Sequence, residues 1–320
     1  KRSVEHMVAE SPSIAVLGAG AWGTALAAAA RRAGRTVALW AREADVREAI
    51  AGRGENTPFL PGIRLPAGLS LPDDPAAAAA EAGIVLLAAP AQHLRQQLAL
   101  IAPAVKPGTP LIVCAKGLER STARLMTEIV AEAAPGAEAA ILSGPSFAKE
   151  MVLGMPTVVT IASRWEKTAK KAQALFSSEK FRAYTSTDVM GVQVGGSLKN
   201  VIAIAAGMGD GMGLGHNTRA AIITRGLAEI SRIAMRMGAN PLTLSGLAGM
   251  GDLVLTCTGE LSRNRKVGME LGKGRSLDEI LKEMKQVAEG VKTAKSAKDL
   301  STKLGVELPI CDQVYRIAYE

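Results

Sequence analysis

A glycine-rich segment near the start of the chain has the spacing of a phosphate-binding turn. Residues 18–23 read GAGAWG, a G-x-G-x-x-G pattern that follows an apolar run and opens an alanine-rich stretch with helical periodicity. In that setting Gly18 permits a tight turn, Gly20 lets a pyrophosphate approach the backbone, and Gly23 lets the helix pack closely on the strand. The N–H groups at the helix start attract the anion. The segment predicts a dinucleotide site, and the alternative is a turn that serves packing alone.

The end of the second predicted strand indicates which dinucleotide is bound. An NAD site usually has an Asp or Glu about 20 residues after the glycine motif, at the end of this strand, where it binds the ribose 2′-hydroxyl. Here the strand Val37–Trp40 is followed by Ala41 and Arg42, with no carboxylate at its end. A guanidinium can bind a 2′-phosphate through two parallel hydrogen bonds. Arg42 therefore favours NADP, and the alternative is a solvated charge that opens the next helix.

Two further segments have the composition of anion-binding loops. Residues 143–150 (SGPSFAKE) leave an apolar strand where the loops of a parallel sheet line the ligand crevice, so they are a candidate substrate wall. The alternative is a strand-to-helix turn in which Ser146 caps the helix. Residues 262–266 (SRNRK) combine guanidinium donors with a predicted helix start, which suits phosphate. The alternative there is a basic, capped helix.

Two lysine-containing segments are expected to face each other between the halves of the chain. Lys116 lies two residues beyond the predicted strand Leu111–Cys114. Lys199 and Asn200 lie at the start of the first long helix of the second half. Either lysine alone would more often be a solvated surface residue, so the expectation rests on their joint position at a cleft.

The elements that position these residues alternate in the first half of the chain. From Ser13 to about Tyr184, short apolar runs alternate with alanine-rich stretches at helical period, as in βα units that build a parallel sheet. The expected strands are Ile14–Leu17, Thr36–Trp40, Ile84–Ala88, Leu111–Cys114, Ala139–Leu142 and Thr157–Ile161. The expected helices between them include Thr24–Ala33, Ala91–Ile101 and Leu125–Ala133.

After about Asp188 the strand pattern ends and longer helical periods follow. The expected helices are Gly196–Ala206, Ala220–Met237, Leu277–Lys285 and Val291–Leu304. The sequence therefore predicts a Rossmann-like, doubly wound parallel α/β sheet over residues 13–190. A mostly α-helical second domain is predicted over residues 191–320, with a ligand cleft between the two.

The composition excludes several other classes of protein. A length of 320 residues suits two domains, and 48% apolar with 21% charged residues excludes disorder as the main state. Aromatic residues make up only 3%, which disfavours an all-β fold and a single-strand nucleic-acid surface. The net charge of +8 suits a phosphorylated small molecule as well as a nucleic acid, so the shortage of aromatic residues decides against the latter. We therefore expect a phosphorylated small-molecule substrate and no nucleic-acid partner.

Cysteine usage and hydropathy predict a cytoplasmic protein. Cys114, Cys257 and Cys311 are far apart and lack zinc-ligand spacing, so neither a metal site nor a disulfide framework is expected. No apolar run is expected to reach the ~18 residues of a membrane span, and the N-terminus lacks the core of a signal peptide. Met7 is a natural initiator, so the residues before it are expected to lie outside the fold, and a further tail is expected after Glu320.

Taken together, these motifs resemble one enzyme family. The sequence is similar to bacterial NAD(P)-dependent glycerol-3-phosphate dehydrogenase across essentially Ser13 to Tyr319. The resemblance rests on GAGAWGTALA at 18–27, KGLE at 116–119, SGPSFAKE at 143–150, GVQVGGSLKNVIAIAAGMGDG at 191–211, GLAGMGDLVLTCTGELSRNR at 246–265 and VAEGVKT at 287–293.

The resemblance implies reversible hydride transfer between sn-glycerol 3-phosphate and dihydroxyacetone phosphate, which supplies the backbone of phospholipids. It implies Lys199 as proton acceptor, with Lys116 and Asp252 beside it in the catalytic set. The implied substrate residues are Lys116, Gly144, Ser146, Lys199, Asn200, Asp252, Thr256, Ser262, Arg263 and Asn264. The implied cofactor residues are Gly18, Gly20, Ala21, Trp22, Gly23, Arg42, Lys116, Ala148, Arg263, Val287 and Glu289. The cofactor is NADP or NAD, with NADP favoured, and we consider a homodimer as the assembly.

The chain departs from the family pattern at two positions. Many bacterial members have Ser in place of Ala21, so one hydroxyl contact to the cofactor is lost here. His216 stands in a glycine-rich loop where Asp or Ala is more usual.

A lysine acts as a base only if its pKa falls from about 10.4 toward neutrality. Burial and a neighbouring cation such as Lys116 would lower the pKa of Lys199, whereas Asp252 would raise it. The sequence leaves the balance between these effects open.

Two alternative functions belong to other classes. A related two-domain dehydrogenase of hydroxyacids would use His216 as its base, but the candidate phosphate site at 262–264 argues against a substrate without phosphate. A non-catalytic NADP sensor would keep the glycine motif, but it would not need Lys116, Lys199 and Asp252.

Overall fold

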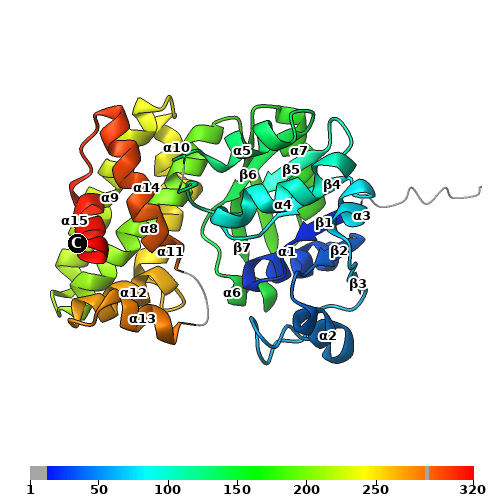
Figure 1. Ribbon diagram of the computed structural model, residues 1–320, viewed down its shortest axis with the longest axis horizontal. Helices are drawn as coiled ribbons and strands as arrows, with labels where there is room; N and C mark the ends of the chain where they lie inside the picture. The colour runs from blue at the N-terminus through cyan, green and yellow to red at the C-terminus, as the bar shows by residue number, and fades with distance from the viewer. Residues whose placement is uncertain (1–12, 121, 285–287) are drawn as a thin grey trace, which may run out of the picture.

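A computed structural model describes residues 13–120, 122–284 and 288–320 of the chain. The chain forms two parts that lie side by side, a sheet covered by helices and a group of helices around the long helix α8 (Val189–Gly211) (Figure 1). The candidate site residues come from both parts.

An eight-stranded sheet forms the centre of the first part. Its strands are β1 (Ile14–Leu17), β2 (Val37–Trp40), β3 (Leu69–Ser70), β4 (Ile84–Leu87), β5 (Pro110–Val113), β6 (Glu138–Ser143), β7 (Thr157–Ser163) and β8 (Phe181–Ser186). Their order is β3-β2-β1-β4-β5-β6-β7-β8, so the chain switches from one side of β1 to the other after β3. Ligands of such sheets bind beyond the carboxyl ends of the strands at this switch point. The predicted doubly wound fold is confirmed.

One strand pair departs from the predicted parallel sheet. β7 runs antiparallel to β6, with Ser143 opposite Thr160. The short helix between them, α6 (Ala148–Val152), packs against α1 (Ala21–Arg32). Strand β7 therefore begins beside the carboxyl end of β6.

The six predicted strands are present, one with identical bounds and the others with ends shifted by one or two residues, but the sequence patterns do not predict the two edge strands. β3 contains only two residues. In β8, buried Phe181 and Ala183 alternate with exposed Arg182 and Tyr184. Edge strands need only one apolar face, so their hydrophobic signal is weak.

Helices cover both faces of the sheet. They are α1, α2 (Ala44–Arg53), α3 (Pro75–Ala80), α4 (Leu94–Ile101), α5 (Met126–Ala133), α6 and α7 (Glu166–Phe176), with short 3₁₀ turns η1 (Ala91–His93) and η2 (Ala102–Ala104). One apolar core, which includes Ile14 and Val16, lies against α1, α2, α6 and α7. The other, which includes Ala15 and Leu17, lies against α3, α4 and α5. Because both faces are buried, the strands read as continuous apolar runs.

The second part is helical, as predicted. Its elements are α8, α9 (Gly215–Arg236), α10 (Pro241–Ser245), a π-helical turn η3 (Leu247–Gly251), α11 (Asp252–Thr258), α12 (Arg263–Gly272), α13 (Leu277–Glu283), α14 (Glu289–Leu304) and α15 (Pro309–Tyr319). The glycine-rich stretch 247–258 forms η3 and α11, which pack on α8. Packing against a buried helix compensates for the weak helix propensity of glycine.

Helix α8 corrects the expectation that no segment approaches a membrane span. It is 23 residues long, and its composition would allow it to cross a membrane. However, 83% of its most apolar window is buried inside the protein. It is the core helix of the second part, in contact with α9, α11, α12 and α14. Its start is set by the Asp188 side chain, which accepts a hydrogen bond from Gly191 N at 2.8 Å.

Helices α8 and α12 cross with their backbones in direct contact. The contact is made by glycines four residues apart, Gly207 and Gly211 on α8 and Gly268 and Gly272 on α12. A Cβ on Gly268 would lie only 2.0 Å from the carbonyl oxygen of Ile204. The crossing holds α12, and with it the segment 262–266, against the helix that carries Lys199.

We predict that Gly268→Ala lowers the free energy of unfolding by about 1–3 kcal/mol, because the added methyl group forces the two helices apart. Gly52→Ala on α2 is the matched control, since a Cβ there has no atom within 4 Å. It is expected to raise the free energy by up to about 1 kcal/mol through helix propensity. Urea unfolding of both variants checks the difference, and similar effects would contradict the close crossing.

Candidate active site

The glycine motif forms the turn from β1 into α1. Gly18 has φ +111°, and a Cβ there would lie 2.9 Å from the nitrogen of Ala89, so the turn requires glycine. A Cβ on Gly23 would lie 1.8 Å from the carbonyl oxygen of Gly18, so the helix also approaches the turn closely. Gly20 is the N-cap of α1 and has open space beside it. The helix N-terminus can therefore receive a pyrophosphate.

Six buried side-chain polar atoms have no hydrogen-bond partner in the part of the chain that the structure describes, and two of them belong to predicted cofactor residues. These two are Trp22 Nε1 and Glu289 Oε2. Trp22 follows Ala21 in the first turn of α1, and Lys116 Nζ lies 6.0 Å from the centre of its ring. Burial raises the pKa of Glu289, the first residue of α14. Buried polar atoms usually have a hydrogen-bond partner, and these two are available to the polar groups of a dinucleotide. Val287, predicted beside them, lies outside the described residues.

Arg42 lies apart from the other charged candidates, two residues after β2. Its Nε and Nη2 donate to Glu43 Oε1 at 3.0 and 2.7 Å. The two side chains are 72% and 41% exposed. Glu43 is not among the predicted site residues, although its position 20 residues after Gly23 is a signal that could have identified it.

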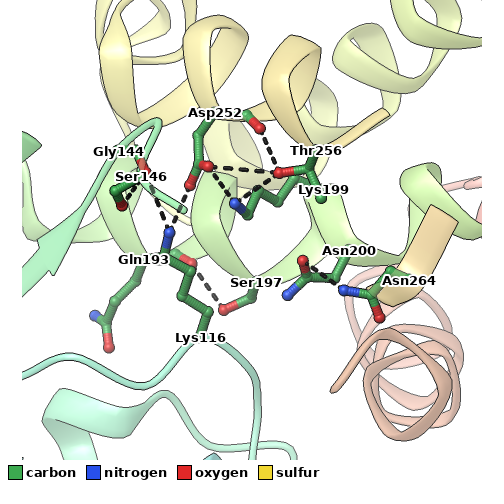
Figure 2. Close-up of polar contacts among 10 residues, drawn as sticks. All are labelled: Lys116, Gly144, Ser146, Gln193, Ser197, Lys199, Asn200, Asp252, Thr256 and Asn264. Carbon is green, nitrogen blue, oxygen red and sulfur yellow. Dashed lines mark hydrogen bonds and ion pairs between the residues drawn. The ribbon is translucent and has the colours of Figure 1, made fainter. Parts of the chain in front are cut away.

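Two lysines from distant parts of the chain contact the same carboxylate, that of Asp252 (Figure 2). Lys116 follows β5, Lys199 lies in the middle of α8, and Asp252 begins α11. Lys116 Nζ lies 2.8 Å from Asp252 Oδ2, and Lys199 Nζ contacts Asp252 Oδ1. Lys199 Nζ also donates to Thr256 Oγ1 at 2.9 Å. The structure thus brings together the two lysines that the sequence places at a cleft.

The burial of this cluster changes its acid–base properties. Burial lowers the pKa of Lys199 to about 7, with a further contribution from Lys116, although Asp252 opposes the shift. Burial acts to raise the pKa of Asp252, but the two ammonium groups outweigh it and hold this pKa below its usual value. The cluster therefore combines an ionised carboxylate with an amine that can gain or lose a proton near neutral pH. These are the requirements of a general acid–base.

The segment 143–150 lies beside Lys116. The carbonyl oxygen of Gly144 accepts hydrogen bonds from Lys116 Nζ at 3.3 Å and from Ser146 Oγ at 2.9 Å (Figure 2). Ser146 does not cap α6, because the N-cap of that helix is Phe147. Ala148 begins α6 and packs on the core that also contacts α1. The segment forms a polar wall next to the charged cluster.

A second polar group joins α8, α12 and α14. Asn264 Nδ2 donates to Asn200 Oδ1 at 3.0 Å, and Asn264 Oδ1 accepts from Gly290 N at 2.9 Å. These two bonds define the orientation of both side-chain amides. Asn200 is the residue after Lys199, so the group borders the charged cluster.

The N-terminus of α12 combines a cap with a cation. Ser262 is the N-cap, and its Oγ accepts a hydrogen bond from Arg265 N at 3.2 Å. Arg263 begins the helix, its side chain is exposed, and Glu289 is a charged neighbour. The capped-helix interpretation is correct in its geometry, and the same geometry provides an arginine and backbone N–H groups for an anion.

Two residues that the sequence patterns do not single out bind α8 to α5 and to the loop after β5. Gln193 Nε2 donates to Thr127 Oγ1 at 2.8 Å, and Gln193 Oε1 accepts from Thr127 N at 3.0 Å. Ser197 Oγ donates to the carbonyl oxygen of Gly117 at 3.1 Å. Their spacing of four residues, which places both on one face of a mostly apolar helix, is the signal that could have identified them.

His216, the base of the alternative dehydrogenase, lies elsewhere. It is exposed near the start of α9, and its ring contacts Arg219. Arg219 Nη1 in turn lies 3.2 Å from Asp210 Oδ1. His216 thus belongs to this surface network and not to the cluster around Asp252.

Family comparisons match both halves of the chain. The family described as NAD-dependent glycerol-3-phosphate dehydrogenase N-terminus matches residues 13–169, and its C-terminus counterpart matches residues 188–320. The glycerol-3-phosphate dehydrogenase (NAD(P)+) of Myxococcus xanthus is 56% identical over 308 residues, 95% of this chain and 92% of that protein. The protein of the same name from Geobacter sulfurreducens is 51% identical over 313 residues, 97% of this chain and 93% of that protein.

Solved structures agree with these matches. A glycerol-3-phosphate dehydrogenase crystal structure from Coxiella burnetii has a TM-score of 0.93 and 38% identity, and the match covers 97% of this chain and 95% of that one. A ketopantoate reductase from Ralstonia eutropha has a TM-score of 0.63 at 16% identity, covering 96% of this chain and 97% of that one. The second likeness shows the fold alone.

The depressed pKa of Lys199 predicts a pH-dependent stability. Between pH 7 and the ordinary lysine pKa, the folded protein keeps Lys199 neutral, whereas the unfolded chain binds a proton there. The free energy of unfolding is therefore expected to rise with pH in this window, by up to about 1.4 kcal/mol per pH unit. The contribution of Lys199 to this free energy is lost as the pH falls toward 7. Urea unfolding of wild type and Lys199→Met at several pH values checks this, and parallel pH profiles would contradict it.

Proposed function

The chain belongs to the NAD-dependent glycerol-3-phosphate dehydrogenase family, and on this premise we propose that it interconverts dihydroxyacetone phosphate and sn-glycerol 3-phosphate with NADP or NAD. It is an oxidoreductase that acts on a CH–OH group. In the reductive direction its product provides the glycerol backbone of phospholipids. The observation that carries the proposal is the buried cluster of Lys116, Lys199 and Asp252 next to a dinucleotide-binding turn.

The cluster supplies the proton that the reaction needs. Bound NAD(P)H supplies the hydride, so the chain has to move one proton and stabilise the carbonyl oxygen. With a pKa of about 7, the Lys199 ammonium donates the proton to that oxygen in reduction, and the amine accepts it in oxidation. Asp252 and Thr256 orient Lys199 Nζ through the contacts described above. Lys116 adds positive charge where the oxygen becomes negative.

The N-terminus of α12 is the proposed site of the substrate phosphate. Arg263 offers a planar fork that suits a dianionic phosphate, and the helix start offers N–H groups. Asn264 on this helix donates a hydrogen bond to Asn200, the residue after Lys199, so both are proposed to contact the three-carbon chain. The remaining proposed substrate contacts are Gly144, Ser146 and Ser262.

The cofactor is proposed to bind along the carboxyl edge of the sheet, from the end of β2 to α14. The proposed contacts are Gly18, Gly20, Ala21, Trp22, Gly23, Arg42, Lys116, Ala148, Arg263, Val287 and Glu289. Trp22 and Glu289 are favoured by their orphaned polar atoms. Arg42 favours NADP, because it stands in the loop that follows β2 and carries a charge complementary to a 2′-phosphate.

We also propose the division into a dinucleotide-binding domain, residues 13–190, and a helical substrate domain, residues 191–320. The sheet ends at Ser186 and α8 begins at Val189, which supports a boundary in the first turn of α8. The three unpaired cysteines support a cytoplasmic location. A homodimer is the proposed assembly.

The test of the reaction is the loss of NADPH or NADH absorbance with dihydroxyacetone phosphate. Unphosphorylated dihydroxyacetone is the control substrate and is expected to react far more slowly. Equal rates with both ketones would exclude a phosphate-dependent enzyme.

We predict that Lys199→Ala lowers kcat by about 10²–10⁴-fold while cofactor affinity stays nearly unchanged, because the general acid–base is removed and the dinucleotide turn is not. His216→Ala is the control and is expected to be nearly silent. Steady-state kinetics and cofactor titration measure both effects. A large loss of rate in His216→Ala would support the hydroxyacid alternative.

We predict that Arg263→Ala lowers kcat/KM for dihydroxyacetone phosphate by roughly ten- to 150-fold, the loss expected for a charge-assisted contact of about 1.5–3 kcal/mol. Because phosphate binding holds the carbonyl carbon in line with the nicotinamide, we expect kcat to fall and KM to rise. Arg263→Lys should restore activity only in part, since an ammonium group lacks the fork. If unphosphorylated dihydroxyacetone loses as much activity, Arg263 is not the phosphate anchor.

A further inference from the structure

The loop after β2 carries a charged pair that the proposed function uses only in part. Arg42 is its proposed 2′-phosphate ligand, but both donors recorded for Arg42 are directed at Glu43. We propose that Glu43 is a second cofactor-specificity residue, which accepts the ribose 2′-hydroxyl of NADH and limits the preference for NADPH. The inference rests on the proposed function and extends it to the choice between the two dinucleotides.

The position of Glu43 suits this role. The turn of the glycine motif is joined to the end of β2 by a hydrogen bond of 2.9 Å from Gly18 N to the carbonyl oxygen of Trp40. The adenosine ribose of a dinucleotide held at this turn lies over the end of β2. Glu43 follows three residues later as the N-cap of α2, but its side chain makes no capping hydrogen bond. The carboxylate instead extends to Arg42.

Arg47 anchors the backbone of the loop that carries Arg42 and Glu43. Arg47 Nη1 donates to the carbonyl oxygen of Ala41 at 2.6 Å, and Arg47 Nε lies 3.2 Å from Asp73 Oδ1. The Arg47 side chain is only 24% exposed. Arg47 therefore anchors the loop. The side chains of Arg42 and Glu43 face solvent, so each can replace its contact with the other by a contact with a ligand.

The two cofactors make opposite demands on this pair. With NADH, the 2′-hydroxyl donates to the Glu43 carboxylate, and Arg42 stays paired. With NADPH, the 2′-phosphate takes the Arg42 guanidinium away from Glu43, and the freed carboxylate stands close to a dianion. Because both side chains are exposed, the repulsion is screened by water and salt. The pair is expected to moderate the preference for NADPH, not to abolish it.

The test is Glu43→Gln, with Glu48→Gln as the matched control. Glu48 is an exposed carboxylate on the same helix, so its change has the same effect on net charge. Dissociation constants for NADPH and NADH are measured by calorimetry without substrate. In Glu43→Gln we expect NADPH to bind about three- to tenfold more tightly and NADH to bind more weakly, with a smaller difference at high salt. Glu48→Gln is expected to leave the ratio of the two constants unchanged.

Binding of cofactor fragments tests whether the effect arises at the 2′ position. Glu43→Gln should strengthen the binding of 2′,5′-ADP and not that of 5′-AMP. An equal change for NADPH and NADH, or the same change in Glu48→Gln, would overturn the proposal. These binding constants need no turnover, so a failure of the ketone assay would reject the proposed reaction without deciding the role of Glu43.

Arg42→Ala tests the other member of the pair. It should weaken the binding of NADPH more than that of NADH. Equal losses for the two cofactors would show that Arg42 does not bind the 2′-phosphate, and the proposed effect of Glu43 on NADPH binding would then fail.

Discussion

A single buried carboxylate holds the candidate active site together. Asp252 is 1% exposed and contacts one ammonium group from each part of the molecule, Lys116 from the loop after β5 and Lys199 from α8. An isolated charge would be unstable at such depth, and two lysines without a carboxylate would repel each other. The three groups therefore depend on one another, and they meet only when the two parts pack together.

Helix α8 makes this packing possible because it carries different side chains on different faces. Its apolar and glycine faces form the core of the helical part and the close crossing with α12. Its polar residues Gln193 and Ser197 bind backbone and side-chain groups of the sheet domain. Lys199 projects toward α11, where Asp252 and Thr256 receive it. A helix with the length of a membrane span is thereby a scaffold for the site.

Charge has different consequences at the two ends of the proposed cofactor path. At the proton-transfer end the side chains are buried, so desolvation moves the pKa of Lys199 by several units and each interaction is strong. At the other end Arg42 and Glu43 are exposed, and their interaction is screened by water. The buried end suits chemistry with strict requirements, and the exposed end suits a graded preference between similar ligands.

The sequence by itself determined the strand–helix alternation, the helical second half and the glycine turn, because each depends on residues that are close in the chain. It also determined the types of residue at the site. Only the tertiary structure decided that burial outweighs the effect of Asp252 on the pKa of Lys199, that Gln193 and Ser197 contact α5 and the loop after β5, and that Glu43 pairs with Arg42. Desolvation and charge pairing are sums over neighbours in space, and most of those neighbours are remote in sequence.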